Sequence, residues 1–422
     1  MADPYYVMVY TLAYIGLFAA SFYIISLLTF YRKKVDPPED TSKTVSILVP
    51  AYNERASIEK TLKSLLALNY PRKNYEIIVV DDGSKDDTYK IAKKFASDKH
   101  PKVKVFTKPN GGKSSAMNLG LKQAQGEIVF SMDADSFVFP DSLKKMTRYF
   151  ANKNVMAVTP AMGVYKPKSI WQRIQHIEYY MGVFLRKSFA TMNAIHITPG
   201  AFSGYRKSFF DKYGGYDEKN ITEDLEVALR IQSHDGIIEN AEKAVIYTLG
   251  PRTFKELLVQ RRRWYTGLIN NLWAYRKKLF GPKKGAMGVI VLPVAVTTVT
   301  LSVLLTVYTF VKGILKIRDN LQAFSSVNFQ FDNILEFNLF ILQTFVLRIF
   351  SSKIFLLSAL FLTLLWFYLA FARKKTQFKE SLKFSFILFI TMYSLLFAFW
   401  WIISAFYVAF NKKVIWREEN KK

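Results

Sequence analysis

Three groups of acidic residues are the clearest candidates for a chemical role in this sequence, and two of them follow predicted strands. "DDGS" at 81–84 follows one apolar run typical of a buried strand, and "DAD" at 133–135 follows another. Alternate residues on an extended chain point to opposite faces, so Asp133 and Asp135 converge only where the chain bends. A bent pair can hold a divalent cation through one carboxylate and steady a sugar hydroxyl through the other. Each motif alone is weak evidence, since Asp-Asp-Gly-Ser is also ordinary turn chemistry.

The third acidic group is "TED" at 222–224, which opens the helical pattern "LEVALRIQ". Thr222 can cap that helix, and acidic residues in a first turn commonly offset the positive end of the helix dipole. Alternatively, Asp224 acts as a general base that takes a proton from an acceptor hydroxyl. The pattern alone leaves both interpretations open.

The segment "QRRRW" at 260–264 combines three arginines with a tryptophan just ahead of a long apolar run. On a helix, Gln260, Arg263 and Trp264 share one face. The Arg263 guanidinium suits a pair of phosphate oxygens, and Trp264 offers a flat surface on which a sugar ring can stack. Arg261 and Arg262 point elsewhere, and we expect them to face phospholipid.

Composition narrows the classes of protein and site. The 422 residues carry a formal net charge of +26, which suits an anionic membrane surface. We expect membrane lipids as partners and no nucleic acid, because the arginines adjoin a membrane stretch and no nucleic-acid module appears. The absence of cysteine excludes disulfides and thiolate-bound zinc. A metal would therefore sit among oxygen ligands, which favours Mg²⁺ or Mn²⁺.

Apolar and charged residues are segregated along the chain. Residues 5–31 are uncharged and long enough to cross a bilayer, and "RKK" at 32–34 predicts that the following segment is cytoplasmic. Further spans are expected at about 287–315, 354–372 and 384–410, with 334–350 interfacial or re-entrant. The predicted division is a transmembrane anchor at 1–34, a cytosolic catalytic domain at 35–250, an interfacial helix region at 251–286, a C-terminal transmembrane region at 287–411 and a basic tail at 412–422.

Between Thr44 and about Leu249, strand patterns alternate with helical patterns. This predicts an α/β domain with a mostly parallel sheet covered by helices on both faces. In such sheets ligands gather at the carboxyl ends of the strands, where the aspartates fall. Residues 170–190 and 253–280 read as amphipathic helices that lie along the membrane interface.

Taken in order, the motifs resemble those of the membrane-integrated family 2 glycosyltransferases, which include hyaluronan, cellulose and poly-N-acetylglucosamine synthases. The resemblance covers residues 45–264. Its motifs are "PAYNE" (50–54), "DDGS", "GGKSSAMNLG" (111–120), "DAD", "GAFSGYRKSFF" (200–210), "TED" and "QRRRW". The resemblance implies a GT-A fold, a nucleotide-sugar donor, a UDP-sugar rather than a GDP-sugar, and inverting transfer to an acceptor hydroxyl. The enzyme would lie in the plasma membrane with its catalytic domain in the cytoplasm.

The resemblance also implies roles for individual residues. Asp224 would be the base, Arg263 would stabilise the leaving diphosphate, and Asp135 would be the main metal ligand beside Asp133. The nucleotide-sugar would contact Tyr52, Glu54, Asp81, Asp82, Lys113, Asp133, Gln260 and Arg263. The acceptor would contact Gly200, Glu223 and Trp264.

Three functions remain open from the sequence. The first is processive synthesis, and possibly translocation, of a polysaccharide. The second is transfer of one sugar to a membrane lipid such as a polyprenyl phosphate or ceramide. The third is a non-catalytic binding or export protein, against which the retention of all three acidic sites argues.

Overall fold

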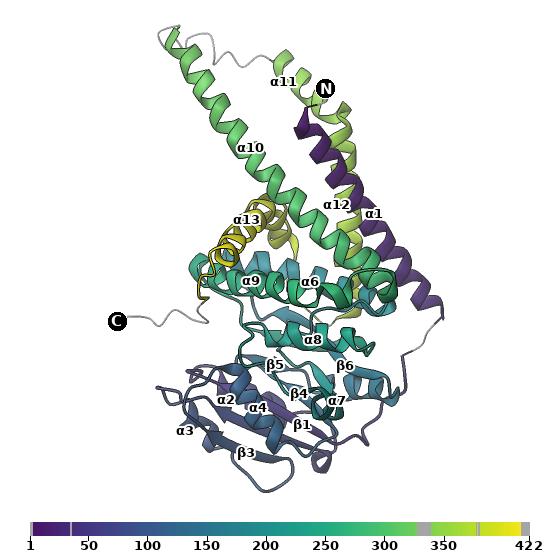
Figure 1. The fold of residues 1–422 in the computed structure, drawn as a ribbon, viewed down its shortest axis with the longest axis vertical. Coiled ribbons are helices and arrows are strands. Elements are labelled where there is room, and N and C mark those ends of the chain that lie inside the picture. Colours follow the sequence, from purple (N-terminus) through teal and green to yellow (C-terminus); the bar gives the residue numbers. More distant parts are fainter. Residues whose placement is uncertain (1–2, 34–35, 327–338, 377, 379, 415–422) are drawn as a thin grey trace.

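A computed structural model describes residues 3–33, 36–326, 339–376, 378 and 380–414. It has a sheet domain at one end and long helices at the other, with two helices lying across the junction (Figure 1). The sheet domain begins with four parallel strands in the spatial order β3-β2-β1-β4. Their bounds are Val45–Ala51 for β1, Tyr75–Asp81 for β2, Lys102–Thr107 for β3 and Ile128–Ser131 for β4.

Shorter and antiparallel strands extend the sheet beyond β4. β7 (Gly204–Arg206) runs antiparallel between β4 and β6 (Val155–Val164). β8 (Ile237–Thr248) is parallel to β6, and β5 (Ser136–Val138) is antiparallel to β8. The described residues therefore form a mixed eight-stranded sheet, in which four of the seven strand pairs are parallel.

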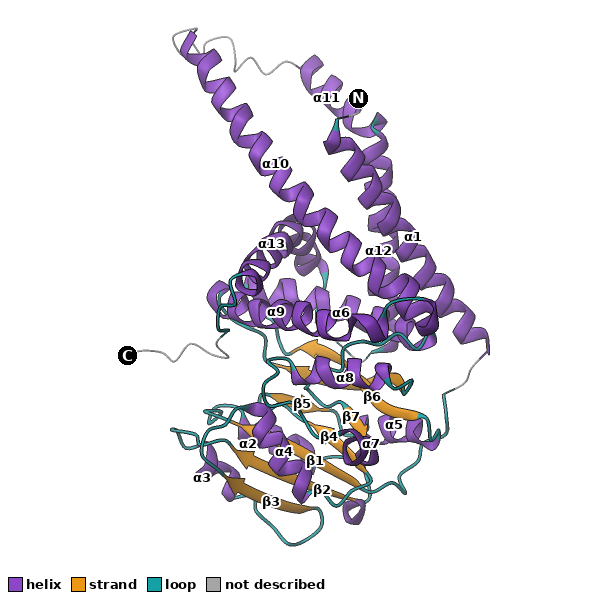
Figure 2. Cartoon of the chain, viewed as in Figure 1, coloured by secondary structure: helices purple, strands orange, loops and turns teal. Residues whose placement is uncertain are grey.

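Alternation along β1 builds a core on each face of the sheet. Ile47 and Val49 pack with Ile58 of α2 on one face, whereas Leu48 packs with Met117 of α4 on the other. Figure 2 shows helices on both faces of the strands. The α/β fold predicted from the sequence is thus confirmed. The helices of this domain are α2 (Ile58–Leu66), α3 (Thr88–Lys93), α4 (Lys113–Gln123), α5 (Ser142–Thr147), α7 (Lys207–Tyr213) and α8 (Glu223–Ser233), with short 3-10 turns η1 (Arg72–Asn74) and η2 (Arg148–Ala151).

Four helices in the described part of the chain are long and apolar enough to cross a membrane, as in an integral membrane protein. Of these, α1 and α12 run side by side (Figure 1). The predicted interfacial or re-entrant segment at 334–350 lies partly outside the described residues, as does the end of the basic tail. The helix bounds are Pro4–Lys33 for α1, Leu292–Ser326 for α10, Leu339–Ser351 for the shorter α11, Lys353–Lys375 for α12 and Lys383–Ala409 for α13, with η3 (Pro282–Lys284) and η4 (Met287–Val291) before α10.

The junction is formed by α6 (Ile170–Thr191) and α9 (Phe254–Leu279). α6 packs against β6 and β8 on one side and against α1, α12 and α13 on the other, so it is buried between the sheet and the long helices. Lys187 of α6 is fully buried and forms a 2.8 Å ion pair with Glu242 of β8. Pairing offsets the cost of burying the two charges, so this pair fixes α6 on the sheet.

Candidate active site

Lys113 lies where three of the predicted motifs meet. Its Nζ is 2.7 Å from Asp133 Oδ1, just beyond β4, and 2.8 Å from Glu223 Oε1, at the start of α8. Burial alone would lower the pKa of Lys113, but Asp133, Glu223 and Asp224 together raise it well above its usual value. The lysine therefore stays charged and holds the "DAD" and "TED" segments together.

Gly200 completes this centre with its backbone. Its backbone N–H donates to Asp224 Oδ2 at 3.2 Å. A Cβ at this position would lie 2.6 Å from Lys113 Nζ and 3.2 Å from Asp133 Oδ1. The close approach of the backbone thus brings the "GAFSGYR" loop onto the lysine–carboxylate group.

Asp224 occupies the first turn of α8, where Thr222 is at the N-cap position without making a side-chain cap hydrogen bond. Besides the bond from Gly200, the Asp224 carboxylate accepts one from the Leu225 N–H at 2.9 Å. Burial, followed by the charge of Glu223, raises the pKa of Asp224 to about 6, against the opposing effect of Lys113 and Arg263. A carboxylate with a pKa near neutrality is well matched to accept a proton.

Asp135 lies beside the end of β8 rather than against Lys113. Its Oδ1 accepts hydrogen bonds from Ser136 Oγ at 3.2 Å and from Thr248 Oγ1 at 3.4 Å. No group of three or more His, Asp or Glu side chains within the described ranges could hold a metal by itself. Two partly exposed carboxylates fit a hard cation that completes its coordination with substrate phosphates and water.

Asp82 and Asp81 form a second group at the end of β2. Asp82 Oδ1 accepts from Lys108 Nζ at 2.8 Å and from the Gly111 N–H at 3.1 Å, and its Oδ2 accepts from the Gly112 N–H at 2.8 Å. Asp82 therefore shapes the loop that leads into Lys113. Asp81 Oδ1 is buried and has no hydrogen-bond partner among the residues that the structure describes.

The loop that carries Tyr52 and Glu54 is tied to this second group. The Asn53 N–H donates to Ser84 Oγ at 3.0 Å, and the Glu54 N–H donates to Thr88 Oγ1 at 2.7 Å. Glu54 Oε2 accepts from Ser57 Oγ at 2.6 Å. Because β1 and β2 are parallel neighbours, the "PAYNE" and "DDGS" segments end at the same edge of the sheet.

The helix α9 directs part of "QRRRW" toward these groups. Arg263 Nη1 donates to the Ile221 carbonyl at 3.4 Å, beside "TED". Gln260 Oε1 accepts from Gln175 of α6 at 2.7 Å, and Trp264 packs against the core of the sheet domain.

The expectation that Arg261 faces lipid is wrong, and the same expectation for Arg262, which is partly exposed, stays a prediction. Arg261 is only 1% exposed and donates through both terminal nitrogens to Glu178 of α6, at 2.7 and 2.5 Å. Its guanidinium carbon lies 4.6 Å from the ring centre of Trp264. Arg262 donates to Tyr407 of α13 at 2.9 Å. These partners are far away in sequence, and α9 is covered by α13 as well as by α8, so helical spacing could not reveal them.

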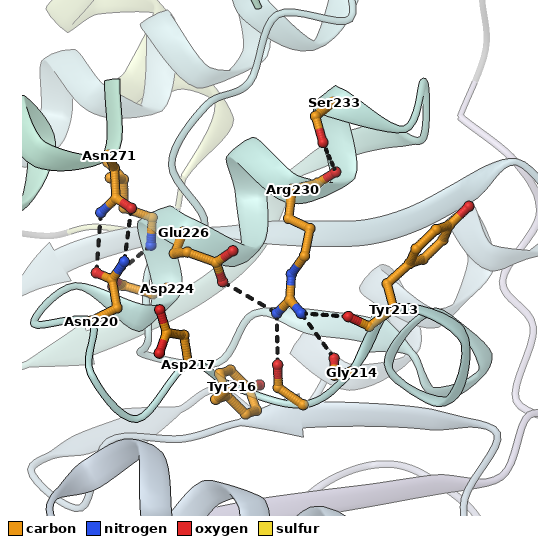
Figure 3. Close-up of polar contacts among 12 residues, drawn as sticks. Tyr213, Gly214, Tyr216, Asp217, Asn220, Asp224, Glu226, Arg230, Ser233 and Asn271 are labelled. Carbon is orange, nitrogen blue, oxygen red and sulfur yellow. Dashed lines mark hydrogen bonds and ion pairs between the residues drawn. The ribbon is translucent and has the colours of Figure 1, made fainter. Parts of the chain in front are cut away.

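Sequence reasoning also missed the polar network that holds the "TED" segment (Figure 3). Arg230 ion-pairs with Glu226 at 3.2 Å and donates to the carbonyls of Tyr213, Gly214 and Gly215 at 2.7–3.0 Å. The Glu226–Arg230 spacing of four residues on a helix was a usable signal for this pair. A second contact joins Asn220 to Asn271 of α9, with Asn220 Nδ2 donating at 2.8 Å, and nothing local predicts it.

Comparisons with known proteins agree with this architecture. Residues 46–214 match the family described as Glycosyl transferase family 2. A poly-beta-1,6-N-acetyl-D-glucosamine synthase of Staphylococcus epidermidis is 34% identical over 236 residues, which cover 54% of this chain and 57% of that protein. The synthase of the same name from Staphylococcus aureus strain COL is 31% identical over 267 residues, covering 61% and 64%. The chain thus spans less than two thirds of the length of these relatives.

A solved structure shares the fold over nearly the whole chain. It is the mannosyltransferase PcManGT from Pyrobaculum calidifontis in complex with GDP-Man and Mn²⁺. The TM-score is 0.57 at 20% identity, over 95% of this chain and 100% of that one. The family match confirms the resemblance to family 2 glycosyltransferases over residues 46–214, and the shared structure confirms the predicted fold class.

Proposed function

We propose, from the premise that residues 46–214 form a family 2 glycosyltransferase domain, that this integral membrane protein is an inverting polysaccharide synthase. The observation that carries the proposal is the meeting of Asp133, Asp224 and the Gly200 backbone around Lys113. These groups come from four separate segments and converge at the carboxyl ends of the strands, where α/β sheets bind ligands.

The proposed reaction is a single displacement at the anomeric carbon of the donor sugar. The acceptor hydroxyl approaches opposite the leaving nucleoside diphosphate, and Asp224 removes its proton as the new bond forms. Arg263, which is close enough to Asp224 to act on its pKa, offers positive charge to the departing phosphates. One displacement inverts the anomeric centre, so an α-linked donor gives a β-linked product.

A divalent cation is part of this proposal. The mannosyltransferase of shared fold was solved with GDP-Man and Mn²⁺, and Asp133 and Asp135 supply oxygen ligands of the kind that Mn²⁺ and Mg²⁺ accept. When bound, the cation would supply charge that neutralises the diphosphate leaving group. Asp81, whose buried Oδ1 lacks a partner among the described residues, is proposed to accept a hydrogen bond from the nucleotide.

We further propose a UDP-sugar donor, a polysaccharide product and a cytoplasmic catalytic domain. The relatives named as poly-beta-1,6-N-acetyl-D-glucosamine synthases support a polymer over a single lipid-linked sugar. The basic "RKK" that follows the first apolar helix supports the cytoplasmic placement. The domain limits predicted from the sequence are part of the same proposal.

The test uses the full chain in detergent or lipid nanodiscs with Mn²⁺ or Mg²⁺ and a panel of UDP-sugars. We expect release of UDP from one donor and a ladder of polymer lengths on a gel, both abolished by a chelator. A single product extractable into organic solvent would indicate that one sugar is transferred to a lipid acceptor and that no polymer is made. Failure to release nucleotide from any donor would contradict the proposal that this chain is an enzyme.

A further inference from the structure

One face of α6 is directed at the candidate active site. Gln175, Tyr179, Gly182 and Arg186 recur at spacings of three and four residues, so they share that face. Gln175 contacts Gln260 of the "QRRRW" segment at 2.7 Å. Tyr179 is buried in the core cluster of the sheet domain, and its pKa responds to the charges of both Asp135 and Arg186.

Arg186 is partly exposed, and it differs from Arg261 and Arg230 in the partners of its guanidinium. Its Nε and Nη2 atoms are buried, and neither has a hydrogen-bond partner in the described part of the chain. By contrast, Arg261 has both oxygens of Glu178, and Arg230 has Glu226 and three carbonyls. Buried N–H groups without acceptors cost free energy, so this side chain is suited to a ligand.

Gly182 gives the Arg186 guanidinium its place. Side chains on a helix lean toward its N-terminus, which carries the guanidinium back over the preceding turn. A Cβ at Gly182 would lie 3.0 Å from Nη1 and 3.6 Å from Cζ of Arg186. The glycine therefore leaves room for the guanidinium on the same face as Tyr179.

Arg186 and Tyr179 are close enough to interact electrostatically. Burial lowers the pKa of Arg186 to about 10, and Tyr179 opposes this shift. Tyr179 is also within electrostatic range of Asp135. Since α6 lies between the sheet and the long helices, Arg186 lies at the junction of the two.

We propose that Arg186, placed by Gly182 and beside Tyr179, forms an acceptor subsite in which its guanidinium donates hydrogen bonds to oxygen atoms of the acceptor. The inference rests on the proposed transferase function and adds a binding residue that the family motifs do not include. The oxygen atoms belong either to neutral hydroxyl and carbonyl groups of a saccharide or to an anionic group such as a lipid phosphate. The experiment distinguishes these two sources.

The test compares Arg186→Gln, Arg186→Lys and Gly182→Ala with the unaltered chain in nanodiscs. Nucleotide release to water, without an acceptor, reports donor binding. Transfer to a neutral N-acetylglucosamine oligosaccharide and to a polyprenyl phosphate in vesicles reports the acceptor. Arg173→Gln is the matched control, because Arg173 lies on the same helix and stacks on Phe384.

For Arg186→Gln we expect an acceptor KM raised about tenfold, the effect of losing hydrogen bonds from a charged donor, with donor KM unchanged. Arg186→Lys should recover part of the loss, and Gly182→Ala should give a smaller rise, because the new methyl shifts the guanidinium by only a few tenths of an ångström. A rise confined to the phosphate acceptor identifies an anionic group, and a rise with the oligosaccharide identifies sugar oxygens. An unchanged acceptor KM, or a raised donor KM, overturns the subsite. Absence of nucleotide release from the unaltered chain would instead contradict the proposed function.

Discussion

The two sides of the candidate active site satisfy their charges in different ways. On the donor side, the Asp82 carboxylate accepts hydrogen bonds from Lys108, Gly111 and Gly112, which lie 26–30 residues further along the chain. On the acceptor side, Asp224 is held by two backbone N–H groups, and its pKa is raised by burial to about 6. Perturbed groups concentrate where chemistry occurs. The comparison therefore contrasts Asp82, which is fixed by a lysine and two backbone N–H groups, with Asp224, whose raised pKa suits it to accept a proton.

The largest effect is expected from Asp224→Asn, which alters only the acceptor side of the site. The amide cannot take a proton, so kcat should fall by about 10²–10⁴-fold while donor affinity is retained. Nucleotide-sugar binding measured by calorimetry and turnover measured by UDP release separate the two effects. Asp217→Asn, on the exposed loop before α8, is the matched control. Preserved turnover in Asp224→Asn would remove this residue as the base.

A smaller effect is expected from Asp82→Asn, the corresponding change on the donor side. It removes the ion pair to Lys108 and sets an amide N–H group against the backbone N–H donors of the 108–112 loop. Hydrogen bonds to charged groups contribute about 1.5–3 kcal/mol each, so donor KM should rise about tenfold or more with little change in kcat. Asp87→Asn, an exposed residue paired with Lys90, serves as the control. A fall in kcat at constant KM would contradict the comparison.

Much of the fold was predictable because its signals are local. The strand patterns "TVSILVPAY" (44–52) and "YEIIVVDDGS" (75–84) contain β1 and β2, and the helical pattern "KSSAMNLGLKQA" (113–124) contains α4. β7 was not predictable in this way. It has three residues and pairs antiparallel between two other strands, and this pairing depends on tertiary contacts.

The residues that form the site were predictable, but the contacts between them were not. The order of the motifs named Lys113 and Glu223 separately, yet their ion pair joins residues more than a hundred positions apart. For Arg261 the sequence predicted the wrong partner. Its sequence neighbours suggested lipid, whereas its carboxylate partner lies on α6. Buried charge pairs between distant helices leave no periodic signal.

A third prediction concerns pH and again separates the two sides. Because Asp224 must be ionised to accept a proton and its pKa is about 6, kcat should fall about tenfold for each pH unit below that value. The raised pKa also means that the folded chain binds this proton more readily than the unfolded chain. Its contribution to stability is therefore present below the ordinary aspartate pKa and lost as pH rises through about 6.

The measurement is a profile of kcat between about pH 5 and pH 8 at saturating donor, beside the donor dissociation constant over the same range. On the donor side, the direct partners of Asp82 are a lysine and backbone N–H groups. The dissociation constant should therefore vary less than kcat. A flat kcat profile across this range would show that ionisation of the buried Asp224 carboxyl does not control catalysis.

The smallest effect is expected from Asn271→Ala, which loosens the acceptor side without touching Asp224. Asn271 Nδ2 donates to Asn220 Oδ1 at 3.1 Å and to Thr222 Oγ1 at 3.0 Å, so it fixes the start of α8 against α9. Losing these neutral hydrogen bonds should cost about 1 kcal/mol of stability and lower kcat a few-fold, with donor KM unchanged. Thermal unfolding and steady-state kinetics test both parts. Asn270→Ala, one position earlier on α9, controls for the loss of an asparagine. If donor KM rose instead, the "TED" segment would belong with the donor side, and the division between the two sides would have to be redrawn.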